Sequence, residues 1–167
     1  MKYFLHSLIV LSQVGLATLS AQAQDTATTA QKETSNKKEI SWMTDWKKAK
    51  DMAQAQNKPI FLFFTGSDWC PWCQKMDHEI LSSQDFIDPL KDKMIFVYVD
   101  FPIGKAQDTT LKEQNDQLKN QYKISGFPTA VILDSKGNPL KELYYTDKGP
   151  KAFVSSVLEA VAQKKQP

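Results

Sequence analysis

Apolar residues in this chain are grouped in two ways: in short unbroken runs, and in longer stretches where they recur every three or four positions. The clearest run is residues 60–64, Ile-Phe-Leu-Phe-Phe, and two similar runs occupy residues 95–99 and 129–133. A run without polar positions is typical of a strand that is buried on both faces of a parallel sheet. The three runs therefore predict the central strands of one sheet.

Between and around these strands, the helical spacing of apolar residues predicts helices. The expected helices span residues 45–57, 71–81, 83–91, 109–122 and 152–162. Thr44 is expected to cap the first helix, and Pro71 suits the first turn of the second. The side chains expected to face inward from the longer helices are those of Trp46, Ala49, Ala53, Cys73, Met76, Ile80, Leu111, Leu118, Tyr122, Phe153, Val157, Leu158 and Val161.

A turn sequence, Ser-Lys-Gly-Asn at residues 135–138, follows the third predicted strand. It predicts a β-hairpin whose second strand ends near Tyr145. Strand–helix–strand units followed by a hairpin and a closing helix are typical of an α/β fold, in which helices sandwich one sheet.

Residues 1–23 have the pattern of a cleaved signal peptide. Lys2 precedes a mostly apolar run from Tyr3 to Leu19, and Ala21-Gln22-Ala23 follows as a small-residue cleavage motif. The alternative is a retained membrane anchor, but a span needs about 20 apolar residues and this run is short and interrupted by polar ones. We therefore expect cleavage after Ala23 and a periplasmic protein.

Composition limits the domain count and the classes of function. The 167 residues suffice for one ordinary globular core. Residues 24–39 contain no large apolar side chain and are expected to form a flexible linker, which leaves residues 40–167 as the single domain. The 21 basic residues are all Lys and stand against 19 acidic ones, and this balance without any Arg argues against nucleic-acid binding.

The chemistry of the chain is concentrated in Cys70-Pro71-Trp72-Cys73, which contains its two cysteines. The motif lies between the strand at 60–64 and the helix at 71–81. The free N–H groups and the dipole of a helix N-terminus favour a thiolate. Cys70 is therefore the expected nucleophile in thiol–disulfide exchange, and Cys73, one turn further in, is expected to resolve the mixed disulfide.

Other uses of the cysteine pair are less favoured by the sequence. A purely structural disulfide across four residues would stabilise the fold by only about 2 kcal/mol. A zinc site needs further ligands, and beyond the signal segment the sequence offers only His78 and no second cysteine pair. We therefore expect a redox pair, with no metal and no cofactor. A peptide-binding or chaperone module in which the pair is incidental stays open as another class.

A second motif, Ser125-Gly126-Phe127-Pro128-Thr129, places a proline directly before the third strand. Together with Trp-Cys-x-x-Cys at a strand–helix junction, it makes residues 40–163 resemble the thioredoxin superfamily, and its exported single-domain members in particular. The resemblance implies a thioredoxin-like sandwich with a central mixed β-sheet flanked by helices. It also implies that Phe127–Pro128 is a cis peptide bond, packed against the cysteine pair beside an edge that receives an extended substrate.

The resemblance also guides the choice of further site residues. Trp69 and Trp72 would form an apolar platform that binds substrate together with Phe127 and Pro128. Thioredoxins carry a buried Asp six residues before the first cysteine, and Phe64 occupies that position here. Proton transfer to and from Cys73 would then use another carboxylate, for which the candidates are Asp68 and Glu79, unless these are solvated surface acids.

The residues around the cysteines also suggest a direction of electron flow. Strong oxidants and isomerases of the superfamily usually carry His between the cysteines, whereas this chain has Pro71-Trp72, and Asp68 would disfavour a nearby thiolate. We therefore expect a reductase rather than an oxidase or isomerase. Its expected partners are disulfide-bonded exported proteins as substrates and a membrane thiol transporter as electron donor. The protein itself is expected to be a monomer.

Overall fold

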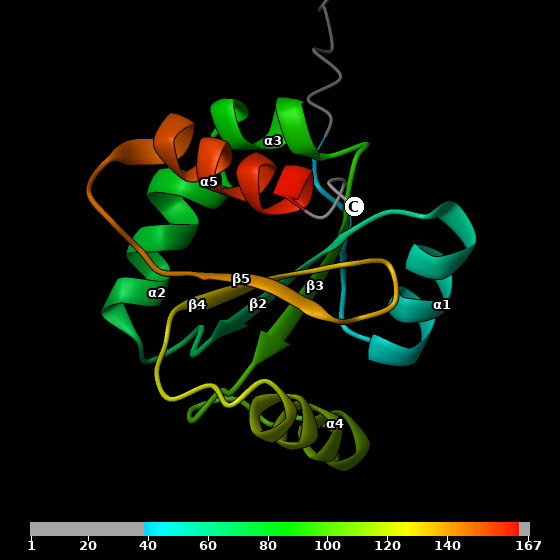
Figure 1. The fold of residues 1–167 in the computed structure, drawn as a ribbon. Coiled ribbons are helices and arrows are strands. Elements are labelled where there is room, and N and C mark those ends of the chain that lie inside the picture. Colours follow the sequence, from blue (N-terminus) through cyan, green and yellow to red (C-terminus); the bar gives the residue numbers. More distant parts are fainter. Residues whose placement is uncertain (1–38, 164–167) are drawn as a thin grey trace, which may run out of the picture. The chain divides into compact units, whose positions relative to one another are not determined.

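A computed structural model describes residues 39–163, and Figure 1 shows the fold of this part. The expected signal peptide and all but the last residue of the expected linker lie outside it. The elements are β1 Trp42–Met43, α1 Trp46–Gln56, β2 Ile60–Thr65, α2 Pro71–Met76, the π-helical turn η1 Asp77–Leu81, α3 Gln84–Leu90, β3 Ile95–Asp100, α4 Thr109–Gln121, β4 Thr129–Leu133, β5 Pro139–Leu143 and α5 Gly149–Gln163.

The strands form one mixed sheet in the order β1-β3-β2-β4-β5. Strand β3 runs parallel to both β1 and β2, and β4 runs antiparallel to β2 and to β5. Phe63 in the middle of β2 pairs with Tyr98 of β3 on one side and with Ala130 of β4 on the other. The expected thioredoxin-like sandwich around a mixed sheet is confirmed.

Helices cover both faces of the sheet (Figure 1). Alternate side chains of β2 belong to two different cores, one on each face. Phe61 and Phe63 belong to the core that β2 shares with α2, η1, α3 and α5. Ile60, Leu62 and Phe64 belong to the core on the other face, with α1 and α4. All six residues of β2 are buried, which explains the unbroken apolar run.

Most predicted elements are confirmed, but the first helix begins one residue later than expected. Its N-cap is Asp45 rather than Thr44, because the Asp45 carboxylate accepts a hydrogen bond from the backbone N–H of Lys48 at 2.9 Å. The strand β1 was not predicted, since two residues are too few to show a periodic pattern.

The expected helix at 71–81 and the closing helix also differ in detail from the prediction. The first is α-helical only to Met76 and continues as the π-helical turn η1. The closing helix begins earlier, at Gly149, and Leu158 is exposed rather than inward. Leu158 lies about 100° around α5 from the buried Val157, which places it beyond the edge of the face that this helix buries.

An aromatic cluster secures the short strand β1. The ring centroid of Trp42 lies 5.4 to 6.2 Å from those of four aromatic residues on β2 and β3: Phe61, Phe63, Phe96 and Tyr98. The opposite edge strand, β5, begins with Pro139 and carries Lys141 and Glu142. The sheet thus ends in a very short strand on one side and a polar strand on the other.

Two tyrosines of the core should make stability fall at alkaline pH. Burial, followed by the nearby Asp100 and Asp77, raises the pKa of Tyr98 to about 12, and burial followed by Asp134 raises the pKa of Tyr122 to about 12. Below pH 10 both the folded and unfolded states hold the phenolic protons. Between about pH 10 and pH 12 the unfolded state releases them first, so stability is lost as pH rises.

The free energy of unfolding, measured in urea, should therefore decrease across this interval. Each tyrosine should contribute at most about 1.4 kcal/mol per pH unit, because each releases a single proton. Replacing Tyr98 or Tyr122 by Phe should make the decrease shallower. An equally steep decrease in the Phe variants would assign the effect to the lysines instead.

Candidate functional site

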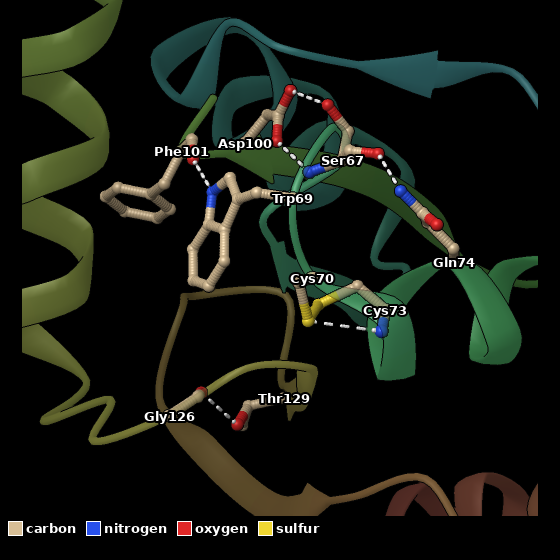
Figure 2. The surroundings of a disulfide bond; sticks show 9 residues. All are labelled: Ser67, Trp69, Cys70, Cys73, Gln74, Asp100, Phe101, Gly126 and Thr129. Carbon is tan, nitrogen blue, oxygen red and sulfur yellow. Dashed lines mark hydrogen bonds between the residues drawn. A yellow bond between two sulfur atoms is a disulfide. The ribbon is translucent and has the colours of Figure 1, made fainter. Parts of the chain in front are cut away.

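The two cysteines are joined by a disulfide at the junction of β2 and α2, with their Cα atoms 5.2 Å apart. Cys70 is the N-cap of α2, and its sulfur accepts a hydrogen bond from the backbone N–H of Cys73 at 3.2 Å (Figure 2). Pro71 occupies the first helical position, where no N–H is needed. Cys70 is 5% and Cys73 1% exposed, so both cysteines are buried and Cys70 is slightly the more exposed residue.

Hydrogen bonds fix the loop that carries Cys70 to the neighbouring strand. The backbone N–H and the hydroxyl of Ser67 donate to the two carboxylate oxygens of Asp100, at 2.9 and 2.6 Å. The side-chain amide of Gln74 donates to the carbonyl of Ser67 at 3.2 Å. The loop is therefore tied both to the end of β3 and to α2, as Figure 2 shows.

Trp69 packs on the domain and also leaves part of its indole exposed. Its Nε1 donates to the carbonyl of Phe101 at 2.7 Å, and 43% of the residue remains exposed. The indole lies so close to Gly66 that a Cβ at that position would overlap it. Gly66 is thus required by this close approach, and Trp69 is fixed beside Cys70.

The segment from Gly126 to Thr129 lies opposite the disulfide (Figure 2). Its Phe127–Pro128 bond is cis, as the resemblance to thioredoxins implied. Pro128 is buried, and the ring of Phe127 stacks on Phe101 with centroids 5.0 Å apart. Phe127 also meets Trp69 edge to face at 6.0 Å. The structure thus brings Trp69 and Phe127 together on one side of the site.

Trp72 lies apart from this group. It is 59% exposed, and its ring centroid is 5.8 Å from that of Tyr145, in the connection between β5 and α5. The two tryptophans expected to form one platform are therefore supported by different parts of the domain.

Asp68 and Glu79, the two candidate proton acceptors, both have other partners. The Asp68 carboxylate accepts hydrogen bonds from the backbone N–H groups of Ile103 and Gly104, at 3.1 and 2.7 Å. Desolvation acts to raise the pKa of Asp68, but these hydrogen bonds, a third from its own backbone N–H and the charge of Lys105 together lower it. Glu79 accepts a hydrogen bond from the hydroxyl of Tyr145. The role of either carboxylate in proton transfer stays a prediction.

Asp77, which lies one helical turn after Cys73, is a further candidate that the sequence motifs did not reveal. Its backbone N–H donates to the carbonyl of Cys73. Although the side chain has an exposed outer surface, its carboxyl group is near enough to the interior for desolvation to raise its pKa, against the opposing effect of His78. The i, i+4 spacing from Cys73 is the signal that could have identified it.

Phe64, at the position where thioredoxins carry a buried Asp, is fully buried in the core with α1 and α4. Within residues 39–163, no group of three or more His, Cys, Asp or Glu side chains could hold a metal ion. In the same range, no helix combines the length and apolar character needed to cross a membrane.

Comparison with known proteins agrees with this geometry. The family described as thioredoxin-like domain matches residues 46–155. The chain belongs to the thioredoxin-like family. It is 41% identical over 113 residues to the disulfide bond reductase DsbH of Chlamydia pneumoniae, an alignment that covers 68% of each chain.

Two further comparisons extend this result. The solved structure of a DsbH oxidoreductase superposes with a TM-score of 0.71 at 38% identity, covering 75% of this chain and 86% of that one. The thioredoxin-related protein DsbJ of Chlamydia pneumoniae is 31% identical over 94 residues, which cover 56% of this chain but only 27% of DsbJ. Together with the Cys70–Cys73 disulfide, these relatives identify the chain as a thiol–disulfide oxidoreductase.

Proposed function

We propose that this thiol–disulfide oxidoreductase is a reductase that acts on disulfides of exported proteins. The observation that carries the proposal is the Cys70–Cys73 disulfide at the β2–α2 junction of a chain that is 41% identical to a disulfide bond reductase. The signal-like pattern of residues 1–23 supports an extracytoplasmic, periplasmic location. We propose that the protein acts as a monomer.

In the proposed reaction, the Cys70 thiolate attacks one sulfur of the substrate disulfide. A bond forms between Cys70 and that sulfur, and the substrate S–S bond breaks, so that the other substrate sulfur leaves and takes up a proton. Cys73 then loses its proton and attacks the Cys70 sulfur. The Cys70–Cys73 disulfide forms, the second substrate thiol is released, and two electrons have passed to the substrate. A membrane thiol transporter is the proposed donor that reduces the pair again.

The surroundings of Cys70 support the reducing direction. A pair becomes a strong oxidant when the thiolate of its reduced form is strongly stabilised. The sulfur of Cys70 accepts a hydrogen bond from the backbone N–H of Cys73. The residues between the cysteines, Pro71 and Trp72, carry no charge that could stabilise a thiolate. Asp68, whose pKa is low, is an anion two residues before Cys70 and disfavours a second negative charge.

The reduction potential of the pair should lie nearer that of thioredoxin, about −270 mV, than that of a strong oxidant, about −120 mV. Equilibration with glutathione or dithiothreitol buffers, followed by alkylation and mass spectrometry, measures it. A value above about −150 mV would show an oxidase instead.

The protein should also accelerate insulin reduction by dithiothreitol, and Cys70→Ser should abolish the acceleration. An equal rate with and without Cys70 would favour the peptide-binding module.

We also propose that Asp77 accepts the proton of Cys73 during the second step. It lies one turn after Cys73, where α2 continues into η1. Its pKa is raised toward that of a thiol, compared with the pKa of an ordinary Asp. Phe64 leaves no acid at the position where thioredoxins carry one. Asp68 and Glu79, by contrast, have the backbone and tyrosine partners described above.

Asp77→Asn should slow the decay of the mixed disulfide on Cys70 by about tenfold or more, because a general base is lost. Quenching with acid and mass spectrometry would detect the accumulated adduct, and Asp77→Glu should restore most of the rate. Asp88→Asn, on the exposed side of α3, is the matched control. Decay at the wild-type rate in Asp77→Asn would return the role to Asp68, Glu79 or water.

The proposed export predicts a mature chain that begins at Gln24, because Ala21 and Ala23 provide the small residues that the peptidase requires. Expression of the full chain in a bacterium, followed by intact-mass measurement of the periplasmic fraction, tests this. Replacing Ala23 with a bulky residue should block cleavage. Recovery of the unprocessed chain from the membrane fraction would contradict the assignment.

A further inference from the structure

Trp72, the residue next to Cys73 in the redox motif, is exposed to solvent but has side-chain contacts that support it. Its indole lies against the ring of Tyr145, with centroids 5.8 Å apart and planes inclined by 36°. Tyr145 is half-buried and packs against the core formed by β2, α3 and α5. The exposed Trp72 on α2 thus packs against Tyr145, a residue more than 70 positions later in the sequence.

Glu79 and Lys75 complete the contact. The Tyr145 hydroxyl donates to Glu79 Oε2 at 2.5 Å, and Lys75 Nζ lies 3.9 Å from Glu79 Oε1. The same Lys75 nitrogen is 5.5 Å from the ring centroids of both Trp72 and Tyr145. We call Lys75, Glu79 and Tyr145 the Trp72 clamp. Each member contacts at least two of the other three side chains in this group of four.

Solvent-exposed ion pairs and cation–π contacts of this kind contribute little to overall stability. Their effect on orientation is larger, because a free tryptophan would otherwise exchange among staggered rotamers. A side chain that is already fixed loses less conformational entropy when a partner binds against it. The arrangement therefore serves binding better than folding.

We propose that the Trp72 clamp positions the Trp72 indole as a rigid apolar wall beside Cys70, and that this wall binds the polypeptide around a substrate disulfide. Trp69, fixed by Phe101 and the close approach of Gly66, is the corresponding rigid indole on the side of Phe127. Lys75, Glu79 and Tyr145 are positioning residues in this scheme. The inference rests on the proposed disulfide exchange and adds that the protein selects polypeptide disulfides over small ones.

The test compares insulin with a small neutral disulfide, bis(2-hydroxyethyl) disulfide, as substrates under dithiothreitol. Tyr145→Leu should raise the KM for insulin about three- to tenfold with little change in kcat. The rate with the small disulfide should change far less, because that molecule has no polypeptide to bind against the wall. The reduction potential should stay at the wild-type value, which separates positioning from tuning of the cysteines.

Tyr144→Leu is the matched control, because Tyr144 is the adjacent exposed tyrosine and its hydroxyl donates to Glu142 at 2.7 Å rather than to Glu79. It should leave the KM for insulin unchanged. Glu79→Gln keeps the size of the side chain but removes its charge, and should raise the KM in the same direction as Tyr145→Leu. An unchanged KM with a slower decay of the mixed disulfide would instead assign Glu79 to proton transfer and overturn the clamp.

A double-mutant cycle shows whether Tyr145 acts through Trp72. Trp72→Leu should itself raise the KM for insulin, and adding Tyr145→Leu should then have little further effect. Independent, multiplicative increases in KM would overturn the proposal. If thermal unfolding shows that Tyr145→Leu does not fold, Tyr145→Phe, which keeps the ring and loses the hydrogen bond to Glu79, takes its place in the cycle.

The outcomes separate the clamp from the function on which it rests. If the wild-type protein reduces neither disulfide, the proposed function is contradicted, and the proposed role of the clamp is contradicted with it. A wild-type protein that reduces both, while Tyr145→Leu and Tyr144→Leu have the same KM for insulin, keeps the function and overturns only the clamp. A selective rise in KM that disappears in the Trp72→Leu background supports both.

Discussion

The complete burial of β2 is the constraint on which the rest of the structure depends. Its apolar side chains fill the cores on both faces of the sheet, between a parallel neighbour and an antiparallel one. A one-residue slip in register would exchange the side chains of the two cores, so that Phe61 and Phe63 would have to pack where Ile60 and Leu62 now fit. The chain therefore leaves the sheet at Thr65 in a fixed place, and Cys70 begins α2 a few residues later. The position of the sulfur atoms follows from the core.

Three carboxylates near the disulfide hold the segments that surround it. Asp100 holds the Cys70 loop through Ser67, Asp68 holds the loop that follows β3, and Glu79 holds Tyr145. Each of these acids therefore has a positioning contact. Desolvation raises the pKa of Asp77, and a raised pKa suits an acid that exchanges protons with a thiol.

The sequence reveals those parts of the fold and site that depend on local patterns. The run at 60–64 predicts β2 because burial on both faces requires apolar residues at every position, and the helix that follows places the cysteine pair. Local patterns cannot reveal contacts made by distant segments. Tyr145 and Glu79 are 66 residues apart, and their hydrogen bond depends on how β5 returns past α2. The misassigned Leu158 has a similar cause, because only packing decides which of two adjacent apolar residues faces the sheet.

The edges of the sheet have a consequence for solubility. An exposed edge strand can pair with a strand from another chain and begin aggregation. Here β1 offers only two residues, while β5 opens with a proline, which has no N–H to donate, and carries Lys141 and Glu142. A reductase of exported polypeptides, as proposed above, would be at particular risk of such pairing. The short and charged edges of this sheet leave little backbone with which such a chain could form an intermolecular sheet.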